Sequence, residues 1–293
     1  MQTNKTASRV LTQGLWPWRL TWICIAAATL VHADERTRKL AARLPEEAAL
    51  FAREATKYSS EETLTQHAVV DRVVVNGIRK EVVKDKVIVS RYGFVSFREA
   101  PETLREMRQI ESVDGKRAKA ERSLKAVATA VTASDERQKR KLMEDFEKAG
   151  LLGVATNLGQ LLLLFSGTKV QNYDFSFQSE KFAGADRVMV FSYAQTEGGG
   201  MTTYRGKDTM RSKLSGEIWV DGDYRPLKVT LNSTVEAPDK KMIRQEMEVR
   251  YAPTLFPCVL PTYARHRELH DGAVEVVNEY QYAAFRPWEE AGN

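Results

Sequence analysis

The sequence predicts an α+β protein in which a long curved antiparallel β-sheet carries helices packed on its concave side. Three observations predict this fold class. An amphipathic helical pattern comes first, short alternating strands fill the chain after residue 168, and helical patterns stay segregated from the strands. The 293 residues are 43% hydrophobic and 28% charged, which excludes a disordered tail, a collagenous repeat and a polytopic membrane protein.

An amphipathic helix is predicted over residues 40–58. Leu44, Ala48, Phe51 and Ala55 recur at three- and four-residue spacing, and charged residues occupy the opposite face. One side of this helix is therefore expected to pack on a sheet.

A long hairpin is predicted next. The β-branched run 68–75 ends at Asn76-Gly77, a strong signal for a tight hairpin turn. The return strand begins at residue 79 and continues to residue 97, where both faces become apolar, and residues 104–113 form a third strand.

A helical insertion is predicted over about residues 116–165. Ser134 is a plausible N-cap within it, and Gly150 is a plausible helix stop. The Leu-rich segment 151–165 fits a buried helix or a buried strand, and we expect a helix.

The rest of the chain reads as an antiparallel meander. The candidate strands are residues 170–177, 187–195, 202–207, 214–220, 227–235, 243–251, 259–269 and 273–285, separated by Gly- and Asp-containing turns. Strands 227–235 and 243–251 alternate apolar and polar residues, so one face of the sheet is expected to face water and the other to be apolar. About eight to ten joined strands must curl, which predicts an apolar concavity.

Two strand segments carry a family resemblance. Gly216-Glu-Ile-Trp-Val-Asp221 followed by Pro226-Leu-Lys-Val229 is similar to a strand-turn-strand of the periplasmic lipoprotein-carrier superfamily, and Tyr280-Gln-Tyr-Ala-Ala-Phe285 resembles the last strand of secreted relatives. The resemblance covers residues 40–288 and implies an incomplete barrel, or half-barrel, closed by helices. The insertion 116–165 departs from the small carriers.

The first 33 residues resemble a secretory signal peptide. They hold three cations and no acidic residue, then a 12-residue apolar stretch from Leu20 to Val31, and end at Ala33. Crossing a bilayer takes ~20 apolar residues, so cleavage after Ala33 is expected, with an uncleaved anchor as the alternative. Residues 34–293 would then form a single domain, and the protein would be periplasmic or secreted.

The charge balance and the cysteine content limit the classes of partner and the role of the remaining thiol. The leader holds 3 of the 44 cations, so the mature chain has 41 against 39 acidic residues, too even a balance for a nucleic-acid surface. Without Cys24, Cys258 is the single thiol left and is expected to be buried. Peripheral contact with a membrane remains open.

No sequence motif indicates a reaction, a metal or a cofactor. Phosphate-loop, dinucleotide, zinc-protease and nucleophile-elbow patterns do not occur in the sequence. His266 and His270 lie four residues apart on a predicted strand, about 13 Å, too far to share one ion. Asp221 and Asp223 are better explained by a hairpin turn than by calcium. We therefore predict no catalytic, metal or cofactor residue.

Three functions remain. The first is a non-catalytic envelope protein that binds a lipid, an acyl chain or a lipidated partner in the concavity. The second is an envelope protein-interaction module with a filled core, and the third is a hydrolase acting on envelope polymers. For the first, the expected sheet residues lining the site are Ile218, Val229, Leu231, Met247 and Val249, with Phe51 and Leu161 as lid or plug contacts.

Overall fold

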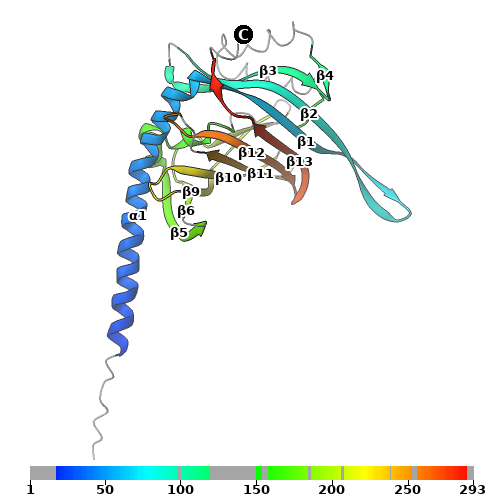
Figure 1. Ribbon diagram of the computed structural model, residues 1–293. Coiled ribbons are helices and arrows are strands. Elements are labelled where there is room, and N and C mark those ends of the chain that lie inside the picture. The colour runs from blue at the N-terminus through cyan, green and yellow to red at the C-terminus, as the bar shows by residue number, and fades with distance from the viewer. Residues whose placement is uncertain are drawn as a thin grey trace, which may run out of the picture.

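The computed structural model describes residues 18–97, 100–118, 150–153, 158–183, 186–205, 208–237, 239–252 and 256–288. One long helix, α1 (Trp18–Glu54), runs beside a large curved sheet (Figure 1). Its buried stripe includes Leu40, Leu44, Ala48 and Phe51, each 0% exposed, which confirms the amphipathic pattern expected from residue 40. The helix begins earlier than expected and ends at Glu54, after which a short 3-10 turn, η1 (Ala55–Lys57), leads into the first strand.

The main sheet is antiparallel at every pairing that the described residues make. Its strands are β1 (Tyr58–Val75), β2 (Ile78–Phe97), β3 (Ala100–Val113), β4 (Lys116–Arg117), β5 (Tyr173–Ala183), β6 (Asp186–Gln195), β9 (Ser215–Val220), β10 (Pro226–Glu236), β11 (Met242–Ala252), β12 (Leu260–His270), β13 (Ala273–Tyr282) and β14 (Arg286–Pro287). They run in the order β4-β3-β2-β1-β13-β12-β11-β10-β9-β6-β5, with the short β14 paired to β1.

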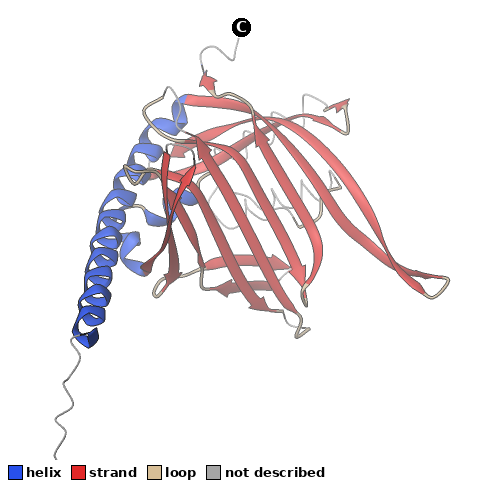
Figure 2. Ribbon diagram, turned by 60° about the horizontal axis from the view of Figure 1, so that its bottom comes forward, coloured by secondary structure: helices blue, strands red, loops and turns tan. Residues whose placement is uncertain are grey.

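The sheet does not close on itself, because β5 and β4 form its two edges. The last long strand joins the first, since β13 pairs with β1 from Glu62 opposite Tyr282 to Ala68 opposite Val276. The amino-terminal hairpin is thereby built into the same sheet as the carboxy-terminal meander. The predicted α+β class, with a long curved antiparallel half-barrel, is confirmed (Figure 2).

Three strand predictions need correction. β1 begins at Tyr58 rather than at residue 68, because the polar residues Ser60, Glu62 and Gln66 occupy inward positions and hide the alternation. The predicted strand 202–207 is β7 (Met201–Arg205), which pairs only with β8 (Asp208–Ser212) in a separate two-stranded sheet. The predicted strand 170–177 begins at Tyr173, because η3 (Gly167–Asn172) is a 3-10 helix.

The Leu-rich segment is not the α-helix that we expected. Only Leu161–Phe165 is helical among its described residues, as the 3-10 helix η2, and Gly167 just beyond it has a φ of 52°. Residues 119–149, where most of the helical insertion was predicted, lie outside the described residues, and β4 occupies Lys116–Arg117.

Helix α1 spans the gap between the two sheet edges. It contacts β5 near one edge and β3 near the other, and it also packs on η2 and η3. Arg36 forms an ion pair with Glu180 of β5 at 3.1 Å, and the Phe51 ring meets Phe94 of β2 edge-on at 5.1 Å. Among the described helices, none has a stretch apolar and long enough to cross a bilayer.

Candidate functional site

The seven residues predicted to line a binding site lie together on the concave side of the sheet. Ile218, Val229, Leu231, Met247 and Val249 come from the adjacent strands β9, β10 and β11, and Phe51 and Leu161 come from α1 and η2. All seven belong to one apolar cluster and are at most 7% exposed. The structure thus groups the predicted residues, but as a packed core. Their role in binding a ligand stays a prediction.

The chain itself occupies the concave face. Residues 150–153 and 158–165, which we call the inner segment, lie against it. The buried apolar side chains of the inner segment are Leu151, Leu158, Leu161, Leu162 and Phe165. Phe165 packs edge-on against Tyr173 and Tyr193 at ring-centroid distances of 5.2 and 5.1 Å. The inner segment therefore covers apolar sheet surface that would otherwise be open to a ligand.

Polar side chains of the sheet hold the main chain of the inner segment at one end. Gln66 donates from Nε2 to the carbonyl oxygen of Leu152 at 2.7 Å, and its Oε1 accepts from the Leu152 N–H at 2.9 Å. Asn278, on the neighbouring strand, donates to the carbonyl oxygen of Gly153 at 2.9 Å. Gln66 and Asn278 also bond to each other at 2.6 Å. Buried amide groups thus recognise an unpaired stretch of backbone.

Two further sheet side chains hold the other end. Glu106 of β3 accepts from the Gly159 N–H at 2.7 Å. Tyr251 of β11 donates to the Gly159 carbonyl oxygen at 3.3 Å and accepts from the Leu162 N–H at 3.2 Å. These contacts replace the ladder bonds that a segment outside the sheet does not have.

Glu106 belongs to a buried ionic cluster. Arg108 donates to both carboxylate oxygens of Glu62, at 2.7 and 2.8 Å, and to Glu106 at 2.7 Å. The Tyr92 hydroxyl donates to Glu106 at 2.9 Å. Burial raises the pKa of Glu62, and Arg108 opposes that rise. Two buried carboxylates therefore share one guanidinium, and Glu106 also holds the inner segment through Gly159.

His266 extends the polar part of the concave face. Its Nδ1 lies 3.1 Å from the Asn278 amide nitrogen, and the side chain is 1% exposed. Burial lowers the pKa of His266 to about 4, so the ring is neutral and Nδ1 accepts from Asn278. His270 instead bonds to Glu268 at 2.7 Å. The described residues hold no group of three His, Cys, Asp or Glu side chains placed for a metal ion.

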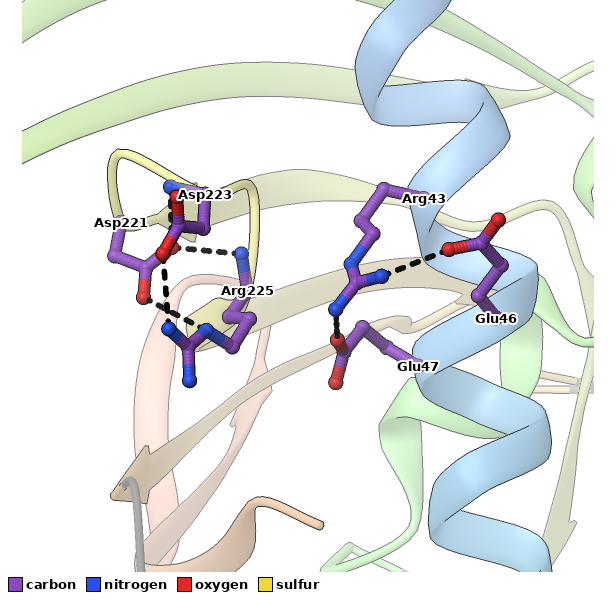
Figure 3. Close-up of polar contacts among 6 residues, drawn as sticks. All are labelled: Arg43, Glu46, Glu47, Asp221, Asp223 and Arg225. Atoms are coloured by element: carbon purple, nitrogen blue, oxygen red, sulfur yellow. Dashed lines mark hydrogen bonds and ion pairs between the residues drawn. The ribbon is translucent and has the colours of Figure 1, made fainter. Parts of the chain in front are cut away.

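The charges where α1 passes the turn between β9 and β10 are satisfied within their own elements (Figure 3). On the helix, Arg43 donates to Glu46 at 2.8 Å and to Glu47. In the turn, Arg225 bonds to Asp223 at 2.9 Å, and Asp221 accepts from the backbone N–H groups of residues 223 and 225. The hairpin-turn interpretation of Asp221 and Asp223 is therefore confirmed. Separating the helix from this turn would break none of these bonds.

Cys258 is buried at 3% exposure, as predicted. Burial raises the pKa of its thiol to about 12. A thiol in this state is a poor nucleophile, so Cys258 acts as a small core residue.

Sequence reasoning missed the residues that hold the inner segment. Gln66, Glu62 and Asn278 lie in phase with inward apolar residues such as Leu64 and Tyr280. Polar residues at core-facing strand positions were the available signal, because a buried polar group needs a partner. Their partners lie too far away in sequence to be identified from it.

The fold and the site together define an open antiparallel half-barrel whose apolar concave face is covered by one helix and by an inner segment of the same chain. No family model matches this chain, and no curated protein matches it. Solved structures that match include a LolA superfamily protein from Nitrosomonas europaea, with 10% identity over 84% of this chain and 93% of that chain and a TM-score of 0.29. A DUF1329 family protein from Desulfovibrio piger matches with 12% identity over 87% of this chain and 92% of that chain and a TM-score of 0.34.

Both TM-scores are below 0.5, so the fold rests on the strand pairing described above.

Proposed function

We propose that this chain is an exported envelope protein that binds a lipid, an acyl chain or a lipidated partner at the concave face and catalyses no reaction. One observation carries the proposal: the apolar concave face is covered by segments that lie outside the sheet's hydrogen-bond ladder. Side-chain packing and a small set of side-chain hydrogen bonds hold this cover. A hydrocarbon chain offers the same kind of contact as the cover, so it can replace the cover.

The energies of this exchange are similar on both sides. Each of the buried apolar side chains of the inner segment contributes roughly 2 kcal/mol by burial, or about 10 kcal/mol together. An acyl chain of about fifteen methylenes gains roughly 12 kcal/mol when it is buried. The apolar burial on the two sides is therefore nearly equal, and the side-chain hydrogen bonds of the inner segment favour its return when the ligand leaves.

The contacts of α1 are also compatible with movement. Arg43 keeps its partners on the helix when the helix moves. The Arg36–Glu180 pair to β5 is partly exposed, with side chains 29% and 23% accessible, and such a pair is worth at most about 1 kcal/mol. The main cost of lifting α1 is thus the exposure of its apolar stripe, which a ligand would cover again.

Export rests on the leader sequence. Helix α1 continues through Ala33, and among the described side chains its contacts with the sheet begin at Arg36. The buried stripe begins at Leu40. Cleavage after Ala33 would give a mature chain that starts inside α1 and keeps the contact of Arg36 and the buried stripe from Leu40.

A protein-interaction module is the second candidate, and one observation favours it. A hollow of about 790 Å³ lies over the outer face of β5, β6 and β9 to β12, lined mainly by polar and charged residues such as Glu217, Glu248 and Arg265. Under this alternative the concave face is a permanently filled core and partners bind outside.

Lipid binding distinguishes the two candidates. The full chain, exported to a bacterial periplasm and purified without detergent, is analysed by native mass spectrometry for retained lipid and then titrated with a fluorescent fatty acid. The carrier proposal predicts a co-purifying lipid or saturable binding that palmitic acid displaces. A ligand-free protein that never binds the probe would contradict it.

A variant pair sharpens the test. In Leu161→Ala/Leu162→Ala the inner segment competes less well, so fatty-acid affinity should rise about tenfold or more, while stability falls. Leu152→Ala is the matched control, because this leucine belongs to the same segment but is 42% exposed. If the double variant loses stability without gaining affinity, the inner segment is an ordinary core element and the module is favoured.

A further inference from the structure

The far end of the β1–β2 hairpin extends from the sheet as a two-stranded ribbon. Pairing between β1 and β13 ends at Ala68, and pairing between β2 and β3 begins only at Ile88. Residues 69–87, which we call the ribbon, therefore pair only with each other, apart from Val87, whose main chain also bonds to Asp114 (Figures 1 and 2). At about 3.3 Å per residue, the turn at Asn76 lies roughly 26 Å beyond the last paired residue of β1.

The ribbon exposes most of the large apolar side chains on the described surface. Seven of the ten exposed large hydrophobics are on it, namely Val70, Val74, Val75, Ile78, Val82, Val83 and Val87. Near the turn, Val74 is 66% and Ile78 is 62% exposed. An isolated two-stranded hairpin is only marginally stable in water. A cluster of exposed apolar side chains such as this one marks an interaction surface.

The apolar residues lie on both faces of the ribbon. Val75 is opposite Ile78 in the register and Val74 is opposite Arg79, so these two pairs point to opposite faces. A protein partner that docks on one face would leave the apolar side chains of the other face exposed to water. A bilayer surrounds an inserted turn on both sides, so the distribution fits a lipid environment.

Cations lie beside the apolar tip on both faces. Arg79 shares a face with Val74, and Lys80, opposite Val73, shares the other face with Ile78. Within the described part of the chain, neither Arg79 nor Lys80 has an ion pair, whereas Arg72 is neutralised by Glu81 at 3.2 Å and Glu275 at 2.9 Å. Unpaired cations next to exposed apolar side chains complement anionic lipid headgroups.

We infer that the ribbon tip is a membrane-docking element for a bilayer surface that carries anionic headgroups. Its unpaired backbone edges exclude deep insertion into hydrocarbon. The apolar side chains at the turn enter the boundary between headgroups and acyl chains, and the two cations bind the headgroup phosphates. The inference does not depend on what the concave face binds, since the tip of the ribbon extends away from α1 (Figure 1).

Vesicle flotation tests the inference on the full chain. The wild type should float with vesicles of phosphatidylethanolamine and phosphatidylglycerol, and much less with vesicles of phosphatidylcholine alone. Val74→Ser/Val75→Ser/Ile78→Ser should lose at least tenfold in affinity, and Arg79→Gln or Lys80→Gln should each lose about fivefold on the anionic vesicles. Phe182→Ser is the matched control, because Phe182 is 73% exposed on another strand.

A probe at the tip provides a second readout. Ile78→Cys, in a Cys24→Ser background, can be labelled selectively because Cys258 is buried. An environment-sensitive fluorophore there should shift to the blue on anionic vesicles. The inference is overturned if the triple variant floats like the wild type, if the probe stays in a polar environment, or if sedimentation shows that the tip variants only dissociate a dimer.

Discussion

Gln66 and Leu152 are joined by two hydrogen bonds, one in each direction, although they lie 86 positions apart in the sequence. The side chain of Gln66 thereby pairs with the main chain of Leu152 much as a neighbouring strand would. This contact and those of Asn278, Glu106 and Tyr251 make the inner segment a separate layer between the sheet and α1. The central question about the molecule is whether a ligand can displace the inner segment from the concave face.

Gln66→Ala should loosen the inner segment at its amino-terminal end, residues 150–153. The substitution leaves the Leu152 N–H and carbonyl groups without their side-chain partner, which should cost about 2 kcal/mol in the free energy of unfolding. Urea denaturation measures this cost, and hydrogen exchange should show a faster Leu152 amide. Gln281→Ala, at an exposed position of β13, should change neither. Equal effects of the two substitutions would mean that the paired bonds contribute nothing specific.

Arg108→Met should be strongly destabilising, because it leaves Glu62 and Glu106 buried without their cation. Removing one partner of a buried ion pair costs about 4 kcal/mol. In contrast, Arg250→Met breaks an exposed pair with Glu248 and should cost less than about 1 kcal/mol. Adding Glu62→Gln and Glu106→Gln to Arg108→Met should recover much of the loss. A triple variant no more stable than Arg108→Met would show that charge burial is not the cause.

His266 should make the protein sensitive to mild acid. Its folded pKa of about 4 is below the usual value of 6.5, so the unfolded chain binds the proton first as pH falls. The stability that the neutral ring contributes is present above 6.5 and is lost as pH falls toward 4. Between about pH 7 and about pH 5, the wild type should lose about 2 kcal/mol more than His266→Gln.

The control for this pH dependence is Gln281→Ala, because Gln281 is exposed and carries no ionisable group. Denaturant titrations at both pH values should give Gln281→Ala the pH dependence of the wild type. A His266→Gln protein that retains the full pH dependence would place its origin elsewhere.

Much of the fold could be predicted from local signals. The turn at Asn76-Gly77 has φ values of 53° and 78°, as a tight hairpin requires, and the apolar stripe of α1 from Leu40 onward follows helical spacing. The alternation along β10 and β11 placed Val229 and Met247 on the inward face, where the structure has them.

The missed features have a common physical cause. Every residue of Leu161–Phe165 is apolar, so the run has no alternation of apolar and polar positions. Periodicity therefore could not distinguish the 3-10 helix from an α-helix or a strand. The inward polar residues Glu62 and Gln66 interrupted the pattern that marks β1. Their burial depends on partners in β3 and in the inner segment, which only the folded chain brings near. The pairing of β13 with β1 is likewise a long-range contact.

Hydrogen exchange of the inner segment in the presence of palmitic acid tests the central claim most directly. The Gly159 and Leu162 amides, now bonded to Glu106 and Tyr251, should lose protection as the fatty acid saturates, because the ligand takes the place of the inner segment. Amides in the middle of β10 and β11 should keep their protection. Unchanged or increased protection at Gly159 and Leu162 under saturating palmitic acid would contradict displacement of the inner segment.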